Sequence, residues 1–288
     1  MRRGLLYAAT ARRATRRYGL RPDRVLGRID DRPVFVVASP RSGTTFMAET
    51  LGGITGFADL GELGPLKEAI PHIAHQPIPE LAPQLRSIIR RAQRVSCLVG
   101  LRAIEQTPES AFVIPALASA FPEAQFVHMV RDGRDVATSL LQKDWLGRGA
   151  RQGWTDDVGQ PYGSHARFWV EPGRAQEFAE ASDARRVAWA WRRYESAVMS
   201  QIDVLGDRML TVRYESMVDD PQATAAELST FLDTGEHMDE FVAAFTATRD
   251  SARGRWRNEL SEDALADIMD EAGPLLTQLG YCNEPRHA

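Results

Sequence analysis

The chain contains few cysteines and few lysines, residue types whose number helps to define several classes of protein. Its 288 residues include only two cysteines, Cys97 and Cys282, and only two lysines, Lys67 and Lys143, among 35 basic residues. Two cysteines cannot build a disulfide framework, which favours a reducing compartment, so we expect a cytoplasmic location. No apolar run approaches the ~18 residues needed to cross a bilayer, and the first residues lack the hydrophobic core of a signal peptide.

Sequence signals for metal and nucleic-acid binding are also missing. The chain has no H-E-x-x-H and no C-x-x-C motif, so we expect no metal. Its formal net charge of −4 and its pI of about 5.9 argue against sequence-specific nucleic-acid binding. With 43% hydrophobic and 26% charged residues, the chain can bury a sizeable core as one domain.

The most informative segment that is present spans residues 34–47, VFVVASPRSGTTFM. A strand-forming run is followed by a polar loop and then by a helix-compatible segment. The free N–H groups and the dipole of a helix N-terminus favour an anion at such a junction. Gly43 allows close backbone approach, and side-chain donors come from the residues around it. These donors are Arg41, Ser42, Thr44 and Thr45.

This loop departs from the nucleotide-triphosphate loop G-x-x-x-x-G-K-[ST]. Thr44 stands where that motif has its lysine, and the cation is Arg41 instead. The lysine of the motif reaches the β- and γ-phosphates, so its absence favours a ligand with one 5′-phosphate and a less charged group beyond it. An ordinary strand-to-helix turn with a capping hydroxyl is the alternative.

A second strand-to-helix junction lies some ninety residues further on. The apolar run 126–130 ends at Arg131, and Ser139 follows about two helical turns later. Ligands of open α/β sheets bind at the carboxyl ends of strands, so both side chains could face a crevice beside the first loop. Alternatively, the charged residues of the RDGRD segment form a surface network of little energetic weight.

Taken together, PRSGTT and RDGRDVATSL resemble the motifs of sulfotransferases that use 3′-phosphoadenosine 5′-phosphosulfate (PAPS). The resemblance is strongest to the branch of the tyrosylprotein sulfotransferases and their bacterial relatives, and it extends from about Val34 to Tyr281. It implies that the first motif, which runs from Arg41 to Thr45 and includes Ser42, Gly43 and Thr44, holds the 5′-phosphosulfate. By the same resemblance, Arg131 and Ser139 hold the 3′-phosphate.

The resemblance also implies further site residues. Glu62 lies where the tyrosylprotein sulfotransferases have their general base, a role that suits a carboxylate, especially one whose pKa burial raises. His72 and His75 are the other candidate bases. Tyr214 resembles a residue of the nucleotide pocket, and Arg255 resembles the basic loop that covers the nucleotide. Surface or packing roles remain open for each of these residues.

One position departs from the family. Many relatives carry a lysine at the position of Gln106, where it is thought to assist departure of the sulfuryl group, and glutamine supplies no charge. We favour Arg41 and backbone N–H groups as the groups that stabilise charge on the bridging oxygen. Slow catalysis or a local shift of the alignment are the alternatives.

Apolar periodicity predicts strands at 33–38, 97–102, 125–130 and 208–213, which alternate with helices. The helix candidates are 44–52, 109–121, 133–142, 182–205, 221–233 and 261–279. This alternation indicates an α/β fold with three layers, in which helices flank a mostly parallel sheet, as in the P-loop NTPase-like sulfotransferase fold. We expect one domain over residues 31–288, with an aromatic, glycine-rich insertion at about 143–178 that shapes the acceptor pocket or packs on the surface.

Residues 1–30 form a separate, arginine-rich helical segment in this interpretation. Residues 1–28 hold nine arginines and one acidic residue, Asp23, which gives them a formal charge of +8. The remainder of the chain therefore carries about −12, since the net charge is −4. The periodicity places five residues on one helical face: Leu5, Ala8, Ala11, Thr15 and Tyr18. Packing of this face on the domain is the expected arrangement, and weak contact with an anionic membrane surface is the alternative.

The function predicted is in-line sulfuryl transfer from PAPS to a hydroxyl acceptor, which could be a small molecule, a carbohydrate or a lipid. PAPS is the expected co-substrate and adenosine 3′,5′-bisphosphate (PAP) the product. A P-loop kinase for small molecules and a non-catalytic nucleotide-binding protein are the two rival functions. Neither the acceptor nor the oligomeric state follows from these residues.

Overall fold

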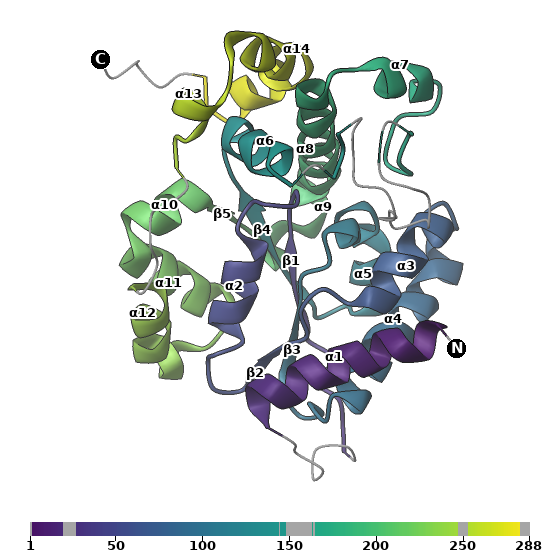
Figure 1. The fold of residues 1–288 in the computed structure, drawn as a ribbon. Coiled ribbons are helices and arrows are strands. Elements are labelled where there is room, and N and C mark those ends of the chain that lie inside the picture. Colours follow the sequence, from purple (N-terminus) through teal and green to yellow (C-terminus); the bar gives the residue numbers. More distant parts are fainter. Residues whose placement is uncertain are drawn as a thin grey trace.

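The computed structural model describes residues 2–19, 27–143, 145–147, 163, 165–246 and 253–282. Five parallel strands form one sheet in the order β2-β3-β1-β4-β5 (Figure 1). The strands are β1 Val34–Val37, β2 Phe57–Asp59, β3 Arg102–Glu105, β4 Gln125–Val130 and β5 Met209–Arg213. The predicted α/β fold with a parallel sheet between helical layers is confirmed.

Helices cover both faces of this sheet and create two hydrophobic cores. Alternate residues of a strand point to opposite faces, so Phe35 and Val37 of β1 join one core while Val34 and Val36 join the other. The first core includes residues of α3 Gly64–Ile73, α4 Ile78–Val95, α5 Ile114–Ala120, α6 Gly133–Leu141, α8 Asp183–Met199 and α14 Glu262–Gln278. The second includes residues of α2 Thr44–Leu51, α10 Tyr214–Asp219, α11 Pro221–Phe231 and α12 Met238–Thr246.

Short helices fill the connections. They are η2 Pro108–Phe112, α7 Ala175–Glu180, α9 Ile202–Leu205, η3 Gly206–Arg208, η4 Gly235–His237 and α13 Trp256–Glu259. Two of the long helices predicted from the sequence are therefore divided. The segment 109–121 becomes η2 and α5, which meet at Val113 just before Pro115, a residue without an N–H group for the helix ladder. The segment 182–205 becomes α8 and α9.

The strand predicted at 97–102 is wrong. Residues 97–101 instead form the turn that ends α4, in which Cys97 has a φ of 54° and the Leu98 N–H donates to the Gln93 carbonyl at 3.0 Å. Many helices end in this way, with one residue in the left-handed conformation and a hydrogen bond from the next N–H group to a carbonyl of the last helical turn. The apolar run at 97–101 is thus the end of a helix, and β3 begins only at Arg102. The three-residue strand β2 was not predicted, because so short a run shows no clear period.

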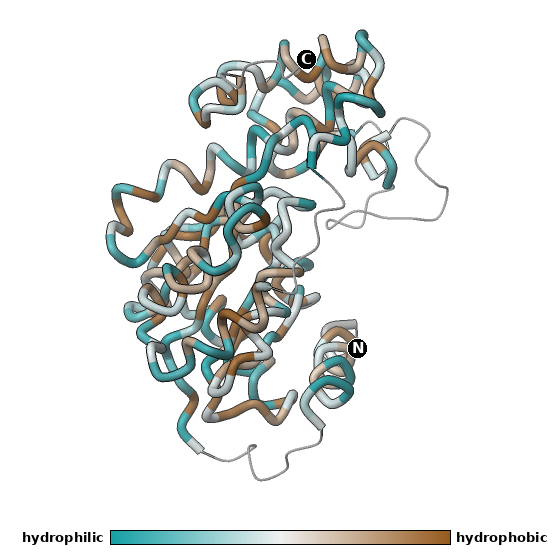
Figure 2. The backbone as a smooth tube through the Cα atoms, turned by 90° about the vertical axis from the view of Figure 1, so that its left-hand side faces the viewer, coloured by the Kyte–Doolittle hydropathy of each residue, from teal (hydrophilic) through white to brown (hydrophobic). Residues whose placement is uncertain are grey.

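The N-terminal helix α1, Arg2–Tyr18, packs on the domain through a different face from the one predicted. Its buried residues are Tyr7, Thr10 and Ala14, whereas Leu5 is 62% exposed. The helix contacts α3 and α4, and Figure 2 shows it at the edge of the molecule. The predicted face failed because several alanines and arginines give α1 two similar apolar stripes, and only tertiary contact selects one.

Part of the insertion at 143–178 lies outside the described residues, including Trp154 and Tyr162. The described part packs inward, since Trp169 is 5% exposed and its ring lies 5.6 Å from that of Phe178 and 6.1 Å from that of Tyr194. Across the described chain, no helix combines the length and the apolar character needed to span a bilayer.

Replacement of Gly133 by alanine should destabilise the fold. A Cβ atom at Gly133 would lie 2.7 Å from Cδ2 of Trp191, a fully buried ring on α8, so α6 and α8 could not approach as closely as they do. We expect the free energy of unfolding to fall by about 1–3 kcal/mol, measured by urea denaturation. Gly4→Ala is the matched control, because Gly4 is also helical and nothing lies within 4 Å of its Cβ position. Equal stability of the two variants would contradict this packing argument.

Candidate active site

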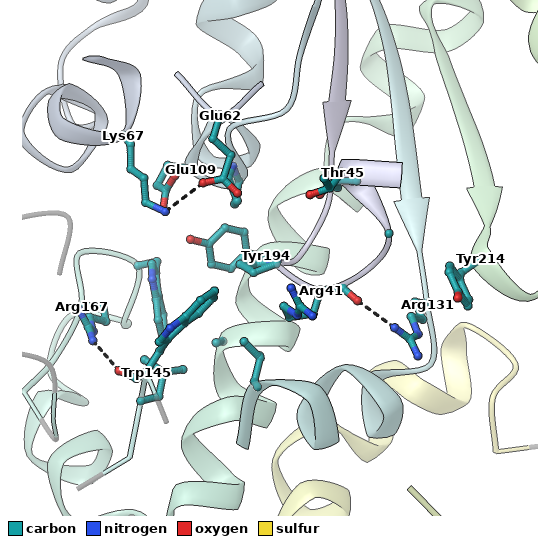
Figure 3. A pocket seen from close by; sticks show the side chains of 18 of the residues that line it. Arg41, Thr45, Glu62, Lys67, Glu109, Arg131, Trp145, Arg167, Tyr194 and Tyr214 are labelled. Atoms are coloured by element: carbon teal, nitrogen blue, oxygen red, sulfur yellow. Dashed lines mark hydrogen bonds and ion pairs between the residues drawn. The ribbon is translucent and has the colours of Figure 1, made fainter. Parts of the chain in front are cut away.

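The two anion-binding motifs lie against each other at the carboxyl end of the sheet. Strands β1 and β4 are neighbours, so the segments that follow them start side by side. Arg131 Nη1 donates to the carbonyl oxygen of Arg41 at 3.1 Å (Figure 3). Arg41 Nε donates to Ser139 Oγ at 3.0 Å. The fold therefore brings together three residues that were predicted as separate halves of one site.

The loop after β1 has the backbone shape of an anion cradle. Arg41 and Gly43 both have a positive φ, 74° and 98°, which turns the chain sharply before α2. No side chain caps α2, so the N–H groups of its first turn are left for a ligand or solvent. Ser42 Oγ is buried and has no hydrogen-bond partner within the described residues. A Cβ at Gly43 would lie 3.0 Å from the Tyr214 ring, so glycine is required there.

The start of this loop is held by a buried carboxylate on α8. Glu195 Oε1 accepts the Ser39 N–H at 3.1 Å, and its Oε2 lies 2.8 Å from Nε2 of His128 on β4. Both Glu195 and His128 are fully buried. The pair ties the strands that precede the two motifs to one helix. Neither residue was predicted, although a carboxylate among the core positions of α8, between Trp191 and Val198, was a signal for such a role.

Arg131 is oriented by an aromatic ring. Its guanidinium carbon lies 4.5 Å from the centroid of Tyr214, the first residue of α10. The next residue, Glu215, accepts the Asp132 N–H at 3.0 Å and the Tyr281 hydroxyl at 2.9 Å. Burial raises the pKa of Glu215 above its usual range. These contacts join the carboxyl ends of β4 and β5, and the Tyr214 ring approaches both Arg131 and Gly43 of the loop after β1.

The other charged residues of the RDGRD segment form a charge network, but it is buried and so differs from the surface network that was the alternative interpretation. Arg134 pairs with Asp132 at 2.7 Å, and Asp135 accepts the N–H groups of Gly254 and Trp256 at 2.7 and 3.1 Å. The network holds the C-terminal segment 254–256 against α6, while Arg131 faces the cavity.

A cavity of about 320 Å³ runs beside both loops. Its wall on the side of the two loops consists of Pro40, Arg41, Gly43, Thr44, Thr45, Phe46, Arg131 and Tyr214. The rest of its wall consists of Glu62, Lys67, Pro108, Glu109, Leu140, Trp145, Leu146, Arg167, Trp169, Ala190 and Tyr194. Figure 3 shows these two groups on either side of Arg41. One end is thus cationic and rich in backbone donors, and the other is aromatic with charges of both signs.

Glu62 lines this cavity but is not buried. Its side chain is 45% exposed, and Oε2 lies 3.4 Å from Nζ of Lys67. The sequence analysis considered a buried Glu62, but the side chain is partly exposed and lies beside the ammonium group of Lys67. Lys67 is one of only two lysines in the chain. The sequence marks Lys67 only as one of two candidates for a lysine-dependent step, and its place at the start of α3 brings it to the cavity.

Six positions singled out in the sequence are not part of the cavity wall: Ser42, His72, His75, Gln106, Ser139 and Arg255. Ser139 reaches the site through Arg41, and Arg255 pairs with Glu259 at 2.6 Å on the surface. His72 and His75 are exposed on and after α3. Gln106 is 1% exposed, and its Oε1 has no hydrogen-bond partner in the described part of the chain.

Two buried ionisable groups lie on or near the side of the cavity that Glu62 lines. Burial lowers the pKa of Arg167 to about 10, and its Nη2 donates to the Trp145 carbonyl at 3.1 Å. Glu105, at the end of β3, is fully buried and accepts the Thr107 N–H at 2.6 Å and the Ser110 hydroxyl at 2.9 Å. Burial raises the pKa of Glu105 to about 7. No group of metal-ligating side chains occurs in the described ranges.

Residues 76–239 match a family model described as "Sulfotransferase family". A curated relative from Aquifex aeolicus, described as an uncharacterized protein, is 27% identical over 149 residues. That match covers 46% of this chain and 20% of the relative, so the chain spans about a fifth of that protein's length.

Solved sulfotransferases share the fold. The sulfotransferase domain from the curacin biosynthetic pathway has a TM-score of 0.57 and 14% identity, with 88% of this chain and 98% of that chain covered. Sulfotransferase STF9 from Mycobacterium avium has a TM-score of 0.52 and 13% identity, with 93% and 81% covered. Mouse sulfotransferase SULT7A1, solved in complex with PAP, has a TM-score of 0.52 and 13% identity, with 91% and 92% covered.

The titration of Glu105 should make stability depend on pH. Because its pKa rises from 4.5 to about 7 on folding, the folded chain binds more protons between these values, and stability falls as the pH rises through this window. Relative to Glu105→Gln, the wild type should lose about 2–3 kcal/mol between pH 5 and pH 8. Urea unfolding of both proteins at the two pH values measures this difference. Parallel pH profiles would show that Glu105 does not titrate in this window.

Proposed function

Because the chain belongs to the sulfotransferase family, we propose that it transfers a sulfuryl group from PAPS to a hydroxyl acceptor. The observation that carries this proposal is the convergence of Arg41, Arg131 and Ser139 beside one cavity. PAPS carries a phosphate on the 3′ side of its ribose and a phosphosulfate on the 5′ side. Two cationic loops on adjacent strands suit those two anionic groups better than they suit a single triphosphate chain.

The residues of the loop fit the 5′-phosphosulfate. Gly43 and the uncapped first turn of α2, with Thr44 and Thr45, would supply N–H and hydroxyl donors. The buried Ser42 Oγ, which has no partner among the described atoms, is a further donor at this position. On the 3′ side, Arg131 and Ser139 would hold the phosphate, with the Tyr214 ring fixing the guanidinium. Arg255 does not line the cavity, so it would contribute to nucleotide binding only from the C-terminal segment that packs against α6.

Glu62 would act on the acceptor as general base. An attacking hydroxyl must lose its proton as the new sulfur–oxygen bond forms, and Glu62 is a carboxylate that lines the cavity. Lys67, 3.4 Å from Glu62, fixes the orientation of that carboxylate. The aromatic side chains of Trp145, Trp169 and Tyr194 would hold the acceptor in line with the donor.

Stabilisation of the leaving group does not need a lysine at position 106. Gln106 is buried outside the cavity wall, whereas Arg41 lines it with the adjacent N–H groups of the loop. These fixed dipoles and the guanidinium would face the bridging oxygen, where charge develops. Lys67 provides a second positive charge on the cavity wall.

A kinase function is not favoured. The loop lacks the lysine of nucleoside-triphosphate enzymes, and the matching family model is that of sulfotransferases. The acceptor could be a small molecule, a carbohydrate or a lipid, since each presents hydroxyl groups. The two cysteines are free thiols, as is usual in a reducing compartment, and a cytoplasmic location stays a prediction.

Nucleotide calorimetry tests the donor site. We expect PAP to bind without Mg²⁺, and AMP, which lacks the 3′-phosphate, to bind about 10- to 100-fold more weakly. Arg131→Ala should reduce the affinity for PAP to that for AMP and leave the affinity for AMP nearly unchanged. Tight binding of ATP that depends on Mg²⁺, with no preference for PAP, would favour a kinase and overturn the proposal.

Replacement of the proposed base tests catalysis separately from binding. Glu62→Gln keeps the size of the side chain but removes its ability to accept a proton, so transfer of labelled sulfate from PAPS into an extract of the source cells should fall about 100- to 10,000-fold. The affinity for PAP should not change. Glu123→Gln is the control, because Glu123 is exposed just before β4. It lies at the amino end of that strand, whereas the loops follow the carboxyl ends of the strands. Retention of wild-type turnover in Glu62→Gln would remove Glu62 from its role, and absence of transfer in the wild type would favour a non-catalytic protein.

A further inference from the structure

A second concave site lies on α1, apart from the nucleotide cavity. This groove of about 530 Å³ is lined by Ala9, Arg12, Arg13, Arg16, Arg17 and Glu49. We refer to it as the α1 groove. Four arginines and a single carboxylate line this shallow groove, and clustered guanidinium groups suit an anionic ligand.

The arginines of the α1 groove divide into two pairs. Arg13 and Arg17 are held by the buried carboxylate of Asp59, at 2.9 and 3.2 Å, and lie within 4 Å of Glu49. Arg12 and Arg16 are exposed, and no ion pair of either occurs among the described residues. The groove therefore keeps an excess of two positive charges over Asp59 and Glu49. Arg12 and Arg16 are the donors that remain available to a ligand.

The α1 groove adjoins the acceptor side of the cavity. Asp59, which binds Arg13, also accepts the Gly61 N–H at 2.6 Å, and Gly61 precedes Glu62. The Arg13 guanidinium packs so closely on Gly61 that a Cβ there would lie 2.1 Å from Nη1. Further along the same segment, a Cβ at Gly64 would lie 3.1 Å from Cδ2 of Leu6. Arg13 and Leu6 of α1 therefore pack on the segment 61–64, and Glu62 of that segment lines the cavity.

We propose that the α1 groove binds an anionic part of the acceptor, so that the acceptor carries phosphate, sulfate or carboxylate groups as well as the reacting hydroxyl. This inference rests on the proposed function. Outside residues 1–28 the chain carries about −12, which repels anions. The excess of positive charge on α1, next to the segment that carries Glu62, would offset that repulsion for an acceptor that lies along this side, so Arg12 and Arg16 are specificity-determining residues.

Direct binding provides the first test. Inorganic pyrophosphate is titrated into the protein at saturating PAP, which occupies the nucleotide site. The wild type should bind it, and the double variant Arg12→Glu/Arg16→Glu should bind at least about tenfold more weakly, with the difference shrinking at high salt. Arg28→Glu/Arg94→Glu changes the net charge equally at exposed positions outside the groove and is the matched control. Equal affinities of the wild type and Arg12→Glu/Arg16→Glu would show that the groove is no anion site.

Transfer of labelled sulfate provides the second test. An extract of the source cells is divided by anion exchange into retained and unretained fractions, and each is offered to the three proteins with PAPS. Labelled product should come from the retained fraction, and Arg12→Glu/Arg16→Glu should raise KM about tenfold or more with little change in kcat. Extraction of the product into organic solvent distinguishes an anionic lipid from a soluble anion. Product from the unretained fraction alone, or equal KM values, would overturn the inference. Absence of transfer by the wild type despite PAP binding would instead refute the proposed function, and the acceptor assignment with it.

Discussion

The active site depends on one buried carboxylate, that of Glu195. It accepts the Ser39 N–H at the start of the anion loop and hydrogen-bonds with His128 on the strand that leads to Arg131. A buried polar group that loses its partner destabilises a protein by about 1–3 kcal/mol, so both strands are strongly held to α8. The same helix supplies Ala190 and Tyr194 to the cavity wall. One helix thus both holds the start of the anion loop and contributes to the cavity wall.

The charges of the site follow the chemistry proposed for each end. The end proposed to bind the nucleotide is built from arginine, whose planar guanidinium can stack and hydrogen-bond at once. Arg131 stacks on Tyr214 while it donates to the Arg41 carbonyl, and Arg41 bonds Ser139. The acceptor side instead combines Glu62 with Lys67. A carboxylate there would take up a proton, so it must lie apart from the arginines that hold an anionic donor.

The N-terminal helix is part of the same design. Asp59 ends β2 and is neutralised by two arginines of α1, while its other oxygen fixes the Gly61 N–H. The Tyr18 hydroxyl donates to the Gly52 carbonyl and accepts the Asp59 N–H. The position of Glu62 therefore depends on a helix that is more than forty residues away in the chain. The arginines of the N-terminal segment therefore have two roles in the fold. Arg13 and Arg17 form ion pairs with the buried Asp59, whereas Arg12 and Arg16 line an exposed groove.

The sequence by itself determined the local units of this protein. The loop from Arg41 to Thr45 and the junction at Arg131 were predictable, because a strand, a turn and a helix start are specified within about ten residues. Most of the parallel sheet followed from the same local patterns. Only the tertiary structure decided which apolar stripe of α1 is buried, that residues 97–101 end a helix, and that Glu195, Lys67 and Arg167 belong to the site. These residues come from segments far apart in the chain, and their roles follow from burial and from distances that no local period encodes.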